Sequence, residues 1–166
     1  MTRIKAIALD VDGVLTDGGF WWGPNGEEWK RFSFTDVMGL SIARKAGLKL
    51  ALISGEDSPL VDRLAAKLGI TDVHKNCKDK AEALRSFADC NQLRLDEICF
   101  MGDDVNDLGA LEIAGLSAAP ADAQRNVLEK AAFVSGHPGG NGAVRELIEA
   151  VIAARCGAPR LERQIA

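Results

Sequence analysis

The first apolar run of the chain, residues 4–9, ends directly in two carboxylic acids, Asp10 and Asp12. The run is almost wholly apolar, which favours a strand that is buried on both faces of a parallel sheet. Residues i and i+2 of an extended segment face the same side, so the two carboxylates converge at the carboxyl end of the strand. Carboxylates there are costly unless a cation binds them, although Asp and Gly also form ordinary turns. The junction therefore predicts a parallel sheet with either a turn or a ligand site at this edge.

Apolar strands and amphipathic helices alternate along the rest of the chain. Asp36 is expected to cap one helix, and Ser58 followed by Pro59 opens the next. This alternation is typical of a Rossmann-like three-layer α/β/α fold, in which a parallel sheet lies between two layers of helices. We expect a single domain over residues 1–156 and a polar C-terminal tail over residues 157–166. The predicted strands are residues 4–9, 48–53, 73–74, 98–101, 116–119 and 132–134, and the predicted helices are residues 36–46, 58–68, 78–91, 106–114, 123–130 and 142–155.

Residues 18–34 interrupt this alternation with a predicted β-hairpin. Two aromatic runs flank a turn of Gly, Pro and Asn, and the runs contain all three tryptophans of the chain, Trp21, Trp22 and Trp29. An isolated hairpin is barely stable, so these side chains need a surface to cover. Internal packing would satisfy them, but an interface between subunits is favoured, because large aromatic patches mark binding surfaces.

Composition and charge argue against several classes of function. The net charge is −4 and no cluster of Lys and Arg is interleaved with aromatic residues, so nucleic acid is not an expected partner. No apolar stretch approaches the roughly 20 residues of a membrane span, so no membrane partner is expected either. The four cysteines form no C-x-x-C pair, and His74 and His137 stand alone, which disfavours zinc and a disulfide framework. We expect a cytoplasmic protein.

Side chains that can do chemistry follow the predicted strands or open a helix. Parallel strands bring their carboxyl ends to one edge of the sheet, so these groups can meet there. Several carboxylates in one place repel each other unless a hard dication such as Mg²⁺ binds them, and a nearby hydroxyl and ammonium would suit a phosphate. The groups are Asp10 and Asp12 after the first strand, Ser54 after the second, Lys80 at a helix start, and Asp103, Asp104 and Asp107 after residues 98–101.

Plainer explanations exist for each of these groups. Ser54 could belong to a simple turn, and an aspartate could cap a helix. One cap accounts for one aspartate, however, and the segment after residues 98–101 has three. Lys80 at a helix start opposes the helix dipole, which disfavours a plain surface role.

In their order along the chain, these segments resemble the four motifs of haloacid dehalogenase superfamily phosphatases. The resemblance implies that Asp10 is a nucleophile that forms an aspartyl-phosphate. It also implies that Asp12 is the general acid for the leaving oxygen and then the general base for water. The segments are Asp10-Val-Asp12-Gly13-Val14, Ile53-Ser54-Gly55, Asp79-Lys80 and Gly102-Asp103-Asp104-x-x-Asp107.

The same resemblance assigns the remaining groups. Ser54 and Lys80 would hold the oxygens of the transferring phosphoryl group. Mg²⁺ would be bound by the Asp10 carboxylate, the backbone carbonyl of Asp12 and the Asp103 carboxylate. Two further carboxylates would support the metal from a second layer or through water, namely Asp104 and Asp107.

The spacing of the motifs leaves no room for a cap domain. Residues 13–53 hold only the hairpin and one helix, and residues 81–102 hold one helix and one strand. The segments 14–19, 28–32 and 139–146 are similar to those of the capless phosphatases of 3-deoxy-D-manno-octulosonate 8-phosphate and their relatives. This similarity implies a phosphorylated 2-keto-3-deoxy sugar acid as substrate. It also implies a homotetramer in which the hairpins meet and neighbouring subunits close the sites.

Two residues bear on which sugar acid is the substrate. The octulosonate enzymes usually carry arginine directly after the glycine of the second motif, where this chain has Glu56. Glu56 with Lys67 on the following helix resembles the nonulosonate (sialic-acid type) 9-phosphate phosphatases, although the two could also be a plain surface pair. A carboxylate in place of a guanidinium inverts the local field. We therefore expect a nonulosonate 9-phosphate as substrate, with octulosonate 8-phosphate as the alternative.

The main rival from another class is the phospho-acceptor receiver domain of signalling pathways. A receiver also combines acids, Mg²⁺ and a lysine on a parallel sheet, but its phosphate acceptor lies on a later strand. Here the D-x-D spacing gives Asp12 a route to hydrolyse a phosphorylated Asp10. A phosphoric monoester hydrolase is therefore the expected function.

Overall fold

Six parallel strands form one sheet in the order β5-β4-β1-β6-β7-β8. They belong to a computed structural model that describes residues 1–157, so the predicted tail lies outside the described residues except for Gly157. β1 is the central strand, and it pairs with β4 on one side and β6 on the other. The parallel sheet of the sequence prediction is confirmed. Its strands are β1 (Ala6–Leu9), β4 (Lys49–Ile53), β5 (Asp72–His74), β6 (Ile98–Met101), β7 (Leu116–Ala119) and β8 (Phe133–Val134).

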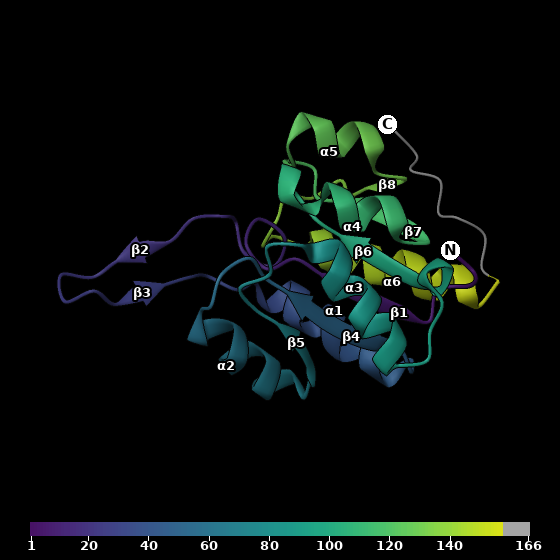
Figure 1. Cartoon of the computed structure of the whole chain (residues 1–166), viewed down its shortest axis with the longest axis horizontal. Coiled ribbons are helices and arrows are strands. Elements are labelled where there is room, and N and C mark those ends of the chain that lie inside the picture. Colours follow the sequence, from purple (N-terminus) through teal and green to yellow (C-terminus); the bar gives the residue numbers. More distant parts are fainter. Residues whose placement is uncertain (158–166) are drawn as a thin grey trace.

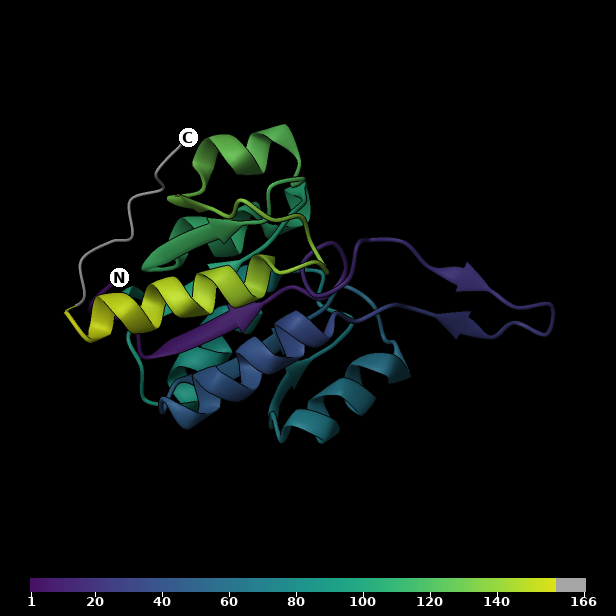
Figure 2. The same ribbon diagram turned by 180° about the vertical axis from the view of Figure 1, so that it is seen from behind.

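Helices cover both faces of this sheet, which gives the predicted three layers. In Figure 1, α3 and α4 lie in front of the strands, and Figure 2 shows α1 and α6 covering the opposite face. Successive residues of β1 alternate between the two resulting cores: Ile7 packs with the side chains of α1, α2 and α6, and Ala8 with those of α3, α4 and α5. The helices are α1 (Phe34–Lys45), α2 (Pro59–Leu68), α3 (Lys80–Cys90), α4 (Leu108–Ile113), α5 (Arg125–Lys130) and α6 (Ala143–Arg155).

Asp36 does not cap α1, so the sequence prediction for this residue was wrong. The helix begins two residues earlier, and the Ser33 hydroxyl is its cap, accepting the N–H of Thr35 at 3.2 Å. Asp36 is fully buried and instead accepts the backbone N–H groups of Gly142 and Arg145, each at 3.0 Å, at the start of α6. Ser and Asp are both good caps, and a contact with a helix more than a hundred residues away decided between their roles.

Several helices begin at other residues than predicted, among them α3, which begins at Lys80 instead of residue 78, and two helices further along the chain. Residues 106–114 form a 3₁₀ turn, η2 (Val105–Asp107), followed by the short helix α4, because Asp107 turns inward instead of continuing a regular helix. α5 begins at Arg125, two residues later than expected. By contrast, α2 keeps its predicted signals, with Ser58 as the cap and Gly69 in the left-handed conformation at its end.

The hairpin extends from one end of the molecule (Figure 1), and its ladder is short. Its strands are β2 (Trp21–Trp22) and β3 (Glu28–Trp29), in which Trp21 pairs with Trp29. Trp22 is 72% exposed, and Trp21 and Trp29 are about half exposed, so internal packing does not use these side chains. Within residues 1–157 the two stretches predicted to lack a cap hold only this hairpin, α1, β4, α3, β6 and a 3₁₀ turn, η1 (Leu95–Glu97). None of the described helices has the length and apolar character needed to cross a membrane.

Candidate active site

The carboxyl ends of β1, β4 and β6 meet at one edge of the sheet. Leu9 is in register with Leu52 of β4 and with Met101 of β6. The parallel ladder extends one step further, because the N–H of Asp10 donates to the Met101 carbonyl at 2.9 Å. The residues that follow these strands, among them Asp10, Ser54 and Asp103, therefore lie at the same edge, as the sequence predicted.

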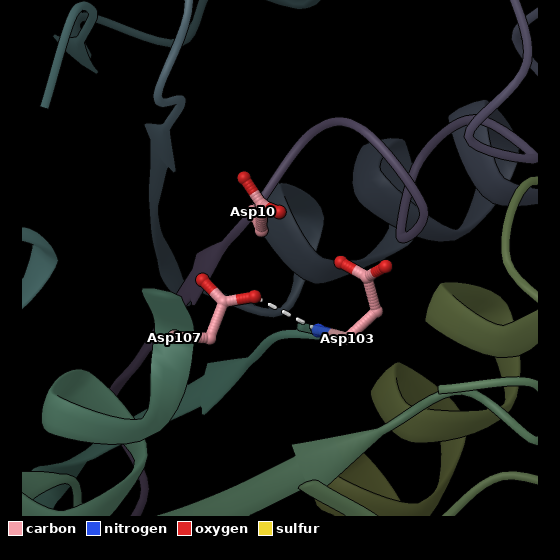
Figure 3. A group of neighbouring side chains, drawn as sticks. All are labelled: Asp10, Asp103 and Asp107. Atoms are coloured by element: carbon pink, nitrogen blue, oxygen red, sulfur yellow. Dashed lines mark hydrogen bonds between the residues drawn. The ribbon is translucent and has the colours of Figure 1, made fainter. Parts of the chain in front are cut away.

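Three carboxylates gather at this edge. Asp10, Asp103 and Asp107 each offer an oxygen, and these oxygens all lie within 4.8 Å of one another (Figure 3). Asp10 follows β1, Asp103 follows β6, and Asp107 ends η2. Asp107 orders the intervening loop, because its Oδ2 accepts the N–H groups of Asp103 at 2.9 Å and of Asp104 at 3.2 Å. The loop after β6 is thus wrapped around one buried carboxylate.

Lys80 supplies the buried positive charge of this cluster. Its Nζ lies 2.8 Å from Asp10 Oδ1 and 2.6 Å from Asp107 Oδ1, and its side chain is 1% exposed. Burial by itself lowers the pKa of this ammonium, but the charges and hydrogen bonds of Asp10 and Asp107 outweigh burial and raise the pKa above its ordinary value. Lys80 therefore stays charged, and one cation faces three carboxyl groups.

The three carboxyl groups can carry more negative charge than Lys80 alone balances, which favours a second cation at this site. Burial, reinforced by the charge of Asp107, raises the pKa of Asp103 to about 6. The same two causes raise the pKa of Asp10 well above its ordinary value, despite the opposing effect of Lys80. Asp103 Oδ1 is buried, and no hydrogen-bond partner for it lies among the described residues. A cluster of hard oxygen donors with one orphaned buried oxygen fits a divalent cation that prefers oxygen ligands.

Gly13 gives Asp103 the space to reach this cluster. Its φ of +82° lies in the left-handed region, and a Cβ at this position would come within 2.1 Å of Asp103 Oδ2. The site therefore requires glycine directly after the D-x-D segment. This role of Gly13 depends on how the distant loop of Asp103 packs, so it is not predicted from the sequence.

The carboxylate of Asp12 lies apart from this cluster, on a second lysine. Lys30 Nζ lies 2.8 Å from Asp12 Oδ1, 2.7 Å from Glu56 Oε2 and 3.6 Å from Glu28 Oε1. Burial lowers the pKa of Lys30, but hydrogen bonds to Asp12 and Glu56 outweigh burial and raise it above the usual lysine value. Sequence reasoning missed Lys30 as a site residue. Its partners come from three separate segments, and no local pattern indicates such a contact.

The other predicted residues lie around these two lysines. Ser54 is buried, and its hydroxyl accepts the N–H of Glu56 at 3.1 Å. Asp104 is exposed and accepts the N–H of Val105 at 2.6 Å, so helix capping, the plainer explanation, describes its contact. The predicted roles of Ser54 with phosphate and of the Asp12 carbonyl with metal stay predictions.

Lys67 lies beside the site, in an open groove of about 310 Å³. Its ammonium lies over the ring of Phe34, 5.1 Å from the centroid. The groove runs between the base of the hairpin and α2, and its lining includes Trp29, Lys30 and Arg63. Lys30 therefore belongs both to the groove and to the ion pairs of Asp12 and Glu56.

Comparisons with known proteins show a family to which the chain is similar. A family model for haloacid dehalogenase-like hydrolases matches residues 58–147. The chain is 36% identical to the 3-deoxy-D-manno-octulosonate 8-phosphate phosphatase of Escherichia coli K12 over 153 residues, which are 92% of this chain and 81% of that protein.

Two solved structures of such phosphatases are also similar to the chain at 34% identity. One is the Moraxella catarrhalis enzyme in complex with a magnesium ion, a phosphate ion and a KDO molecule. The match to it has a TM-score of 0.91 and covers 94% of this chain and 90% of the chain of that enzyme. The other is the cobalt-bound enzyme of Haemophilus influenzae, with a TM-score of 0.90 and coverage of 93% of this chain and 91% of its own.

Proposed function

The chain belongs to the haloacid dehalogenase-like hydrolases, and we propose that it is a Mg²⁺-dependent phosphatase of 3-deoxy-D-manno-octulosonate 8-phosphate. Its membership of a hydrolase family argues against the receiver domain. The observation that carries the proposed chemistry is the cluster of Asp10, Asp103 and Asp107 around Lys80 at the sheet edge. The choice of the octulosonate rests on the relatives, which are phosphatases of that substrate.

This proposal reverses the preference for a nonulosonate 9-phosphate that came from Glu56 and Lys67. That preference assumed that the Glu56 carboxylate inverts the field near the substrate. In the folded chain Glu56 forms an ion pair with Lys30, so part of its charge is compensated. Lys67 is engaged with Phe34. The two residues therefore give weaker support for a nine-carbon substrate than their sequence positions suggested.

In the proposed mechanism, Asp10 and Asp12 divide the reaction into two steps. A carboxylate oxygen of Asp10 attacks phosphorus, the bond from phosphorus to the sugar oxygen breaks, and Asp12 gives that oxygen a proton. Water then attacks the aspartyl-phosphate, Asp12 takes the proton of the water, and inorganic phosphate leaves with Asp10 restored. The separate placement of the two carboxylates, on Lys80 and on Lys30, suits these distinct roles.

The other residues hold charge and geometry during these steps. Mg²⁺ would be held by Asp10, Asp103 and the Asp12 carbonyl, where it offsets the negative charge that the nucleophile and the phosphate bring together. Lys80 keeps Asp10 in place and can share its ammonium with a phosphoryl oxygen. The Ser54 hydroxyl accepts from Glu56, so its own proton is available to another phosphoryl oxygen.

A side-by-side assay tests the choice of substrate. We expect kcat/KM for octulosonate 8-phosphate to exceed that for a nonulosonate 9-phosphate by about 10-fold or more, the scale on which one or two polar contacts discriminate between substrates. Phosphate release is measured with both compounds under the same Mg²⁺ concentration. Glu56→Arg provides the matched variant, because it introduces the residue that is usual in the octulosonate enzymes. A clear preference of the unaltered chain for the nonulosonate would refute the proposal.

Mg²⁺ is expected to raise the melting temperature more at about pH 8 than at about pH 5. The pKa of Asp103 is about 6 in the metal-free protein, above the ordinary value of 3.8, so protons compete with the metal at the lower pH. Without Mg²⁺ the pH dependence has the opposite sign. The contribution of Asp103 to the folding stability of the protein increases as pH falls through 6, because the folded chain binds the proton more tightly than the unfolded chain.

Thermal melts with and without Mg²⁺ at the two pH values check this expectation. Asp103→Asn is the control, and it should lose most of the Mg²⁺-induced rise in melting temperature at both pH values. Equal shifts at the two pH values in the unaltered chain would contradict a proton-competing site.

Self-association through the hairpin is part of the proposal. The exposed side chains of Phe20, Trp21, Trp22 and Trp29 support an interface, since solvent exposure of such a cluster is unfavourable in a single subunit. A tetramer as the final assembly and a cytoplasmic location both stay predictions.

A further inference from the structure

Lys30 joins three segments that are far apart in the sequence. It stands directly after β3, where the hairpin returns to the body of the molecule, whereas Asp12 lies in the loop after β1 and Glu56 in the loop after β4. Its Nζ is within 2.8 Å of an oxygen of each of these two acids, and Glu28 Oε1 lies 3.6 Å away. The Lys30 side chain is only 2% exposed. The long side chain is therefore fixed at its tip by several acceptors at once.

Asp12 is held differently from Asp10. Asp10 is buried and shares Lys80 with Asp107, whereas the side chain of Asp12 is 32% exposed. Within residues 1–157, the ion pair of Asp12 is with Lys30, which engages one of its two oxygens, Oδ1. The contact leaves the other oxygen for proton transfer. A partly exposed carboxylate without this contact would sample several rotamers.

We propose that Lys30 is a positioning residue for Asp12, whose ammonium fixes the carboxylate by one oxygen and thereby aims the other at the reacting atoms. This inference rests on the proposed function, in which Asp12 moves protons in both steps. In this role Lys30 acts through Asp12 and not directly on phosphorus or the leaving oxygen. Glu56 and Glu28 hold the ammonium in place from the second loop and from the hairpin.

The size of the effect follows from the geometry of proton transfer. General acid–base catalysis contributes about 10²- to 10⁴-fold, and it requires a donor–acceptor distance of about 3 Å. A displacement of about 1 Å in a catalytic group can cost about 100-fold. Losing the Lys30 contact should therefore remove part of what Asp12 contributes, and it should remove nothing further once Asp12 has lost its carboxylate.

A double-mutant cycle measures this dependence. The substrate is p-nitrophenyl phosphate with saturating Mg²⁺, so the result does not depend on which sugar acid the enzyme prefers. We expect Lys30→Met to lower kcat by about 10- to 100-fold with Asp12 present, and to change KM by less than about threefold. In the Asp12→Asn background the same substitution should change kcat by less than about threefold. Lys30→Arg should restore most of the rate, because a guanidinium can still contact Asp12 and Glu56.

Matched controls separate positioning from a loss of structure. Lys49→Met makes the same change at an exposed lysine at the start of β4 and should leave kcat and KM unchanged. Thermal melts check that each variant is folded. If Lys30→Met is unfolded, Lys30→Gln, which keeps a hydrogen-bond donor, replaces it in the double-mutant cycle. Equal losses from Lys30→Met with and without the Asp12 carboxylate would overturn the proposal, as would an effect on KM alone. A wrong choice of sugar acid would appear only in the octulosonate assay and would leave this cycle intact.

Discussion

Asp10→Asn is expected to abolish Mg²⁺-dependent phosphate release, with a loss of kcat of about 10⁴-fold or more, as is typical when a covalent nucleophile is removed. The amide of asparagine is a far weaker nucleophile than a carboxylate, and it also offers the metal one oxygen without charge. Malachite-green detection of phosphate released from octulosonate 8-phosphate or p-nitrophenyl phosphate provides the measurement.

The fold of this variant should survive the substitution. Burial and the charge of Asp107 raise the pKa of Asp10, so the ionised carboxylate is already unfavourable in the metal-free protein. Its melting temperature without Mg²⁺ should therefore stay close to that of the unaltered chain. Asp62→Asn, at an exposed carboxylate paired with Lys75, is the matched control and should keep full activity. Intact phosphate release by Asp10→Asn would show that the nucleophile has been assigned to the wrong residue.

Lys80→Met is expected to lower the free energy of unfolding by about 3–5 kcal/mol. The substitution keeps the length and apolar stem of the side chain but leaves Asp10 and Asp107 buried without their shared cation. Urea denaturation of the metal-free proteins at about pH 7 measures the loss. The loss should be smaller at about pH 5, because protonation then removes part of the uncompensated negative charge.

Lys75→Met is the matched control, since Lys75 also contacts two aspartates, Asp57 and Asp62. Both of these carboxylates are more than half exposed, and such surface pairs contribute about 0–1 kcal/mol. A loss in Lys80→Met no larger than that in Lys75→Met would mean that the buried ion pairs do not hold the cluster together. Activity should also fall steeply in Lys80→Met alone, because Lys80 contacts the proposed nucleophile.

Local signals predicted much of the fold correctly. The cap and first-turn proline at Ser58 and Pro59, with Gly69 at the far end, bound α2 as expected, because these residues act within one turn of the helix they limit. The apolar runs that became β1, β4 and β6 were also clear, since burial on both faces requires almost every residue to be apolar. Asp36 was misassigned because its partners, Gly142 and Arg145, lie at the start of a distant helix.

The candidate site, like the fold, was predictable from the sequence only in part. The sequence alone determined that Asp10, Ser54, Lys80 and Asp103 would share one edge of the sheet, because parallel strands with a regular apolar pattern end on the same side. Only the tertiary structure decided how the charges pair. It placed Lys80 between Asp10 and Asp107, and it placed Lys30 of the hairpin on Asp12 and Glu56.

The physical reason lies in the range over which each property acts. Burial and backbone hydrogen bonding impose a repeat of two or 3.6 residues, which a sequence displays directly. An ion pair needs two side-chain tips within about 4 Å, and that depends on how distant segments pack. The chain's sequence therefore reveals where the proposed catalytic carboxylates lie, whereas its folded structure reveals which lysine holds each of them.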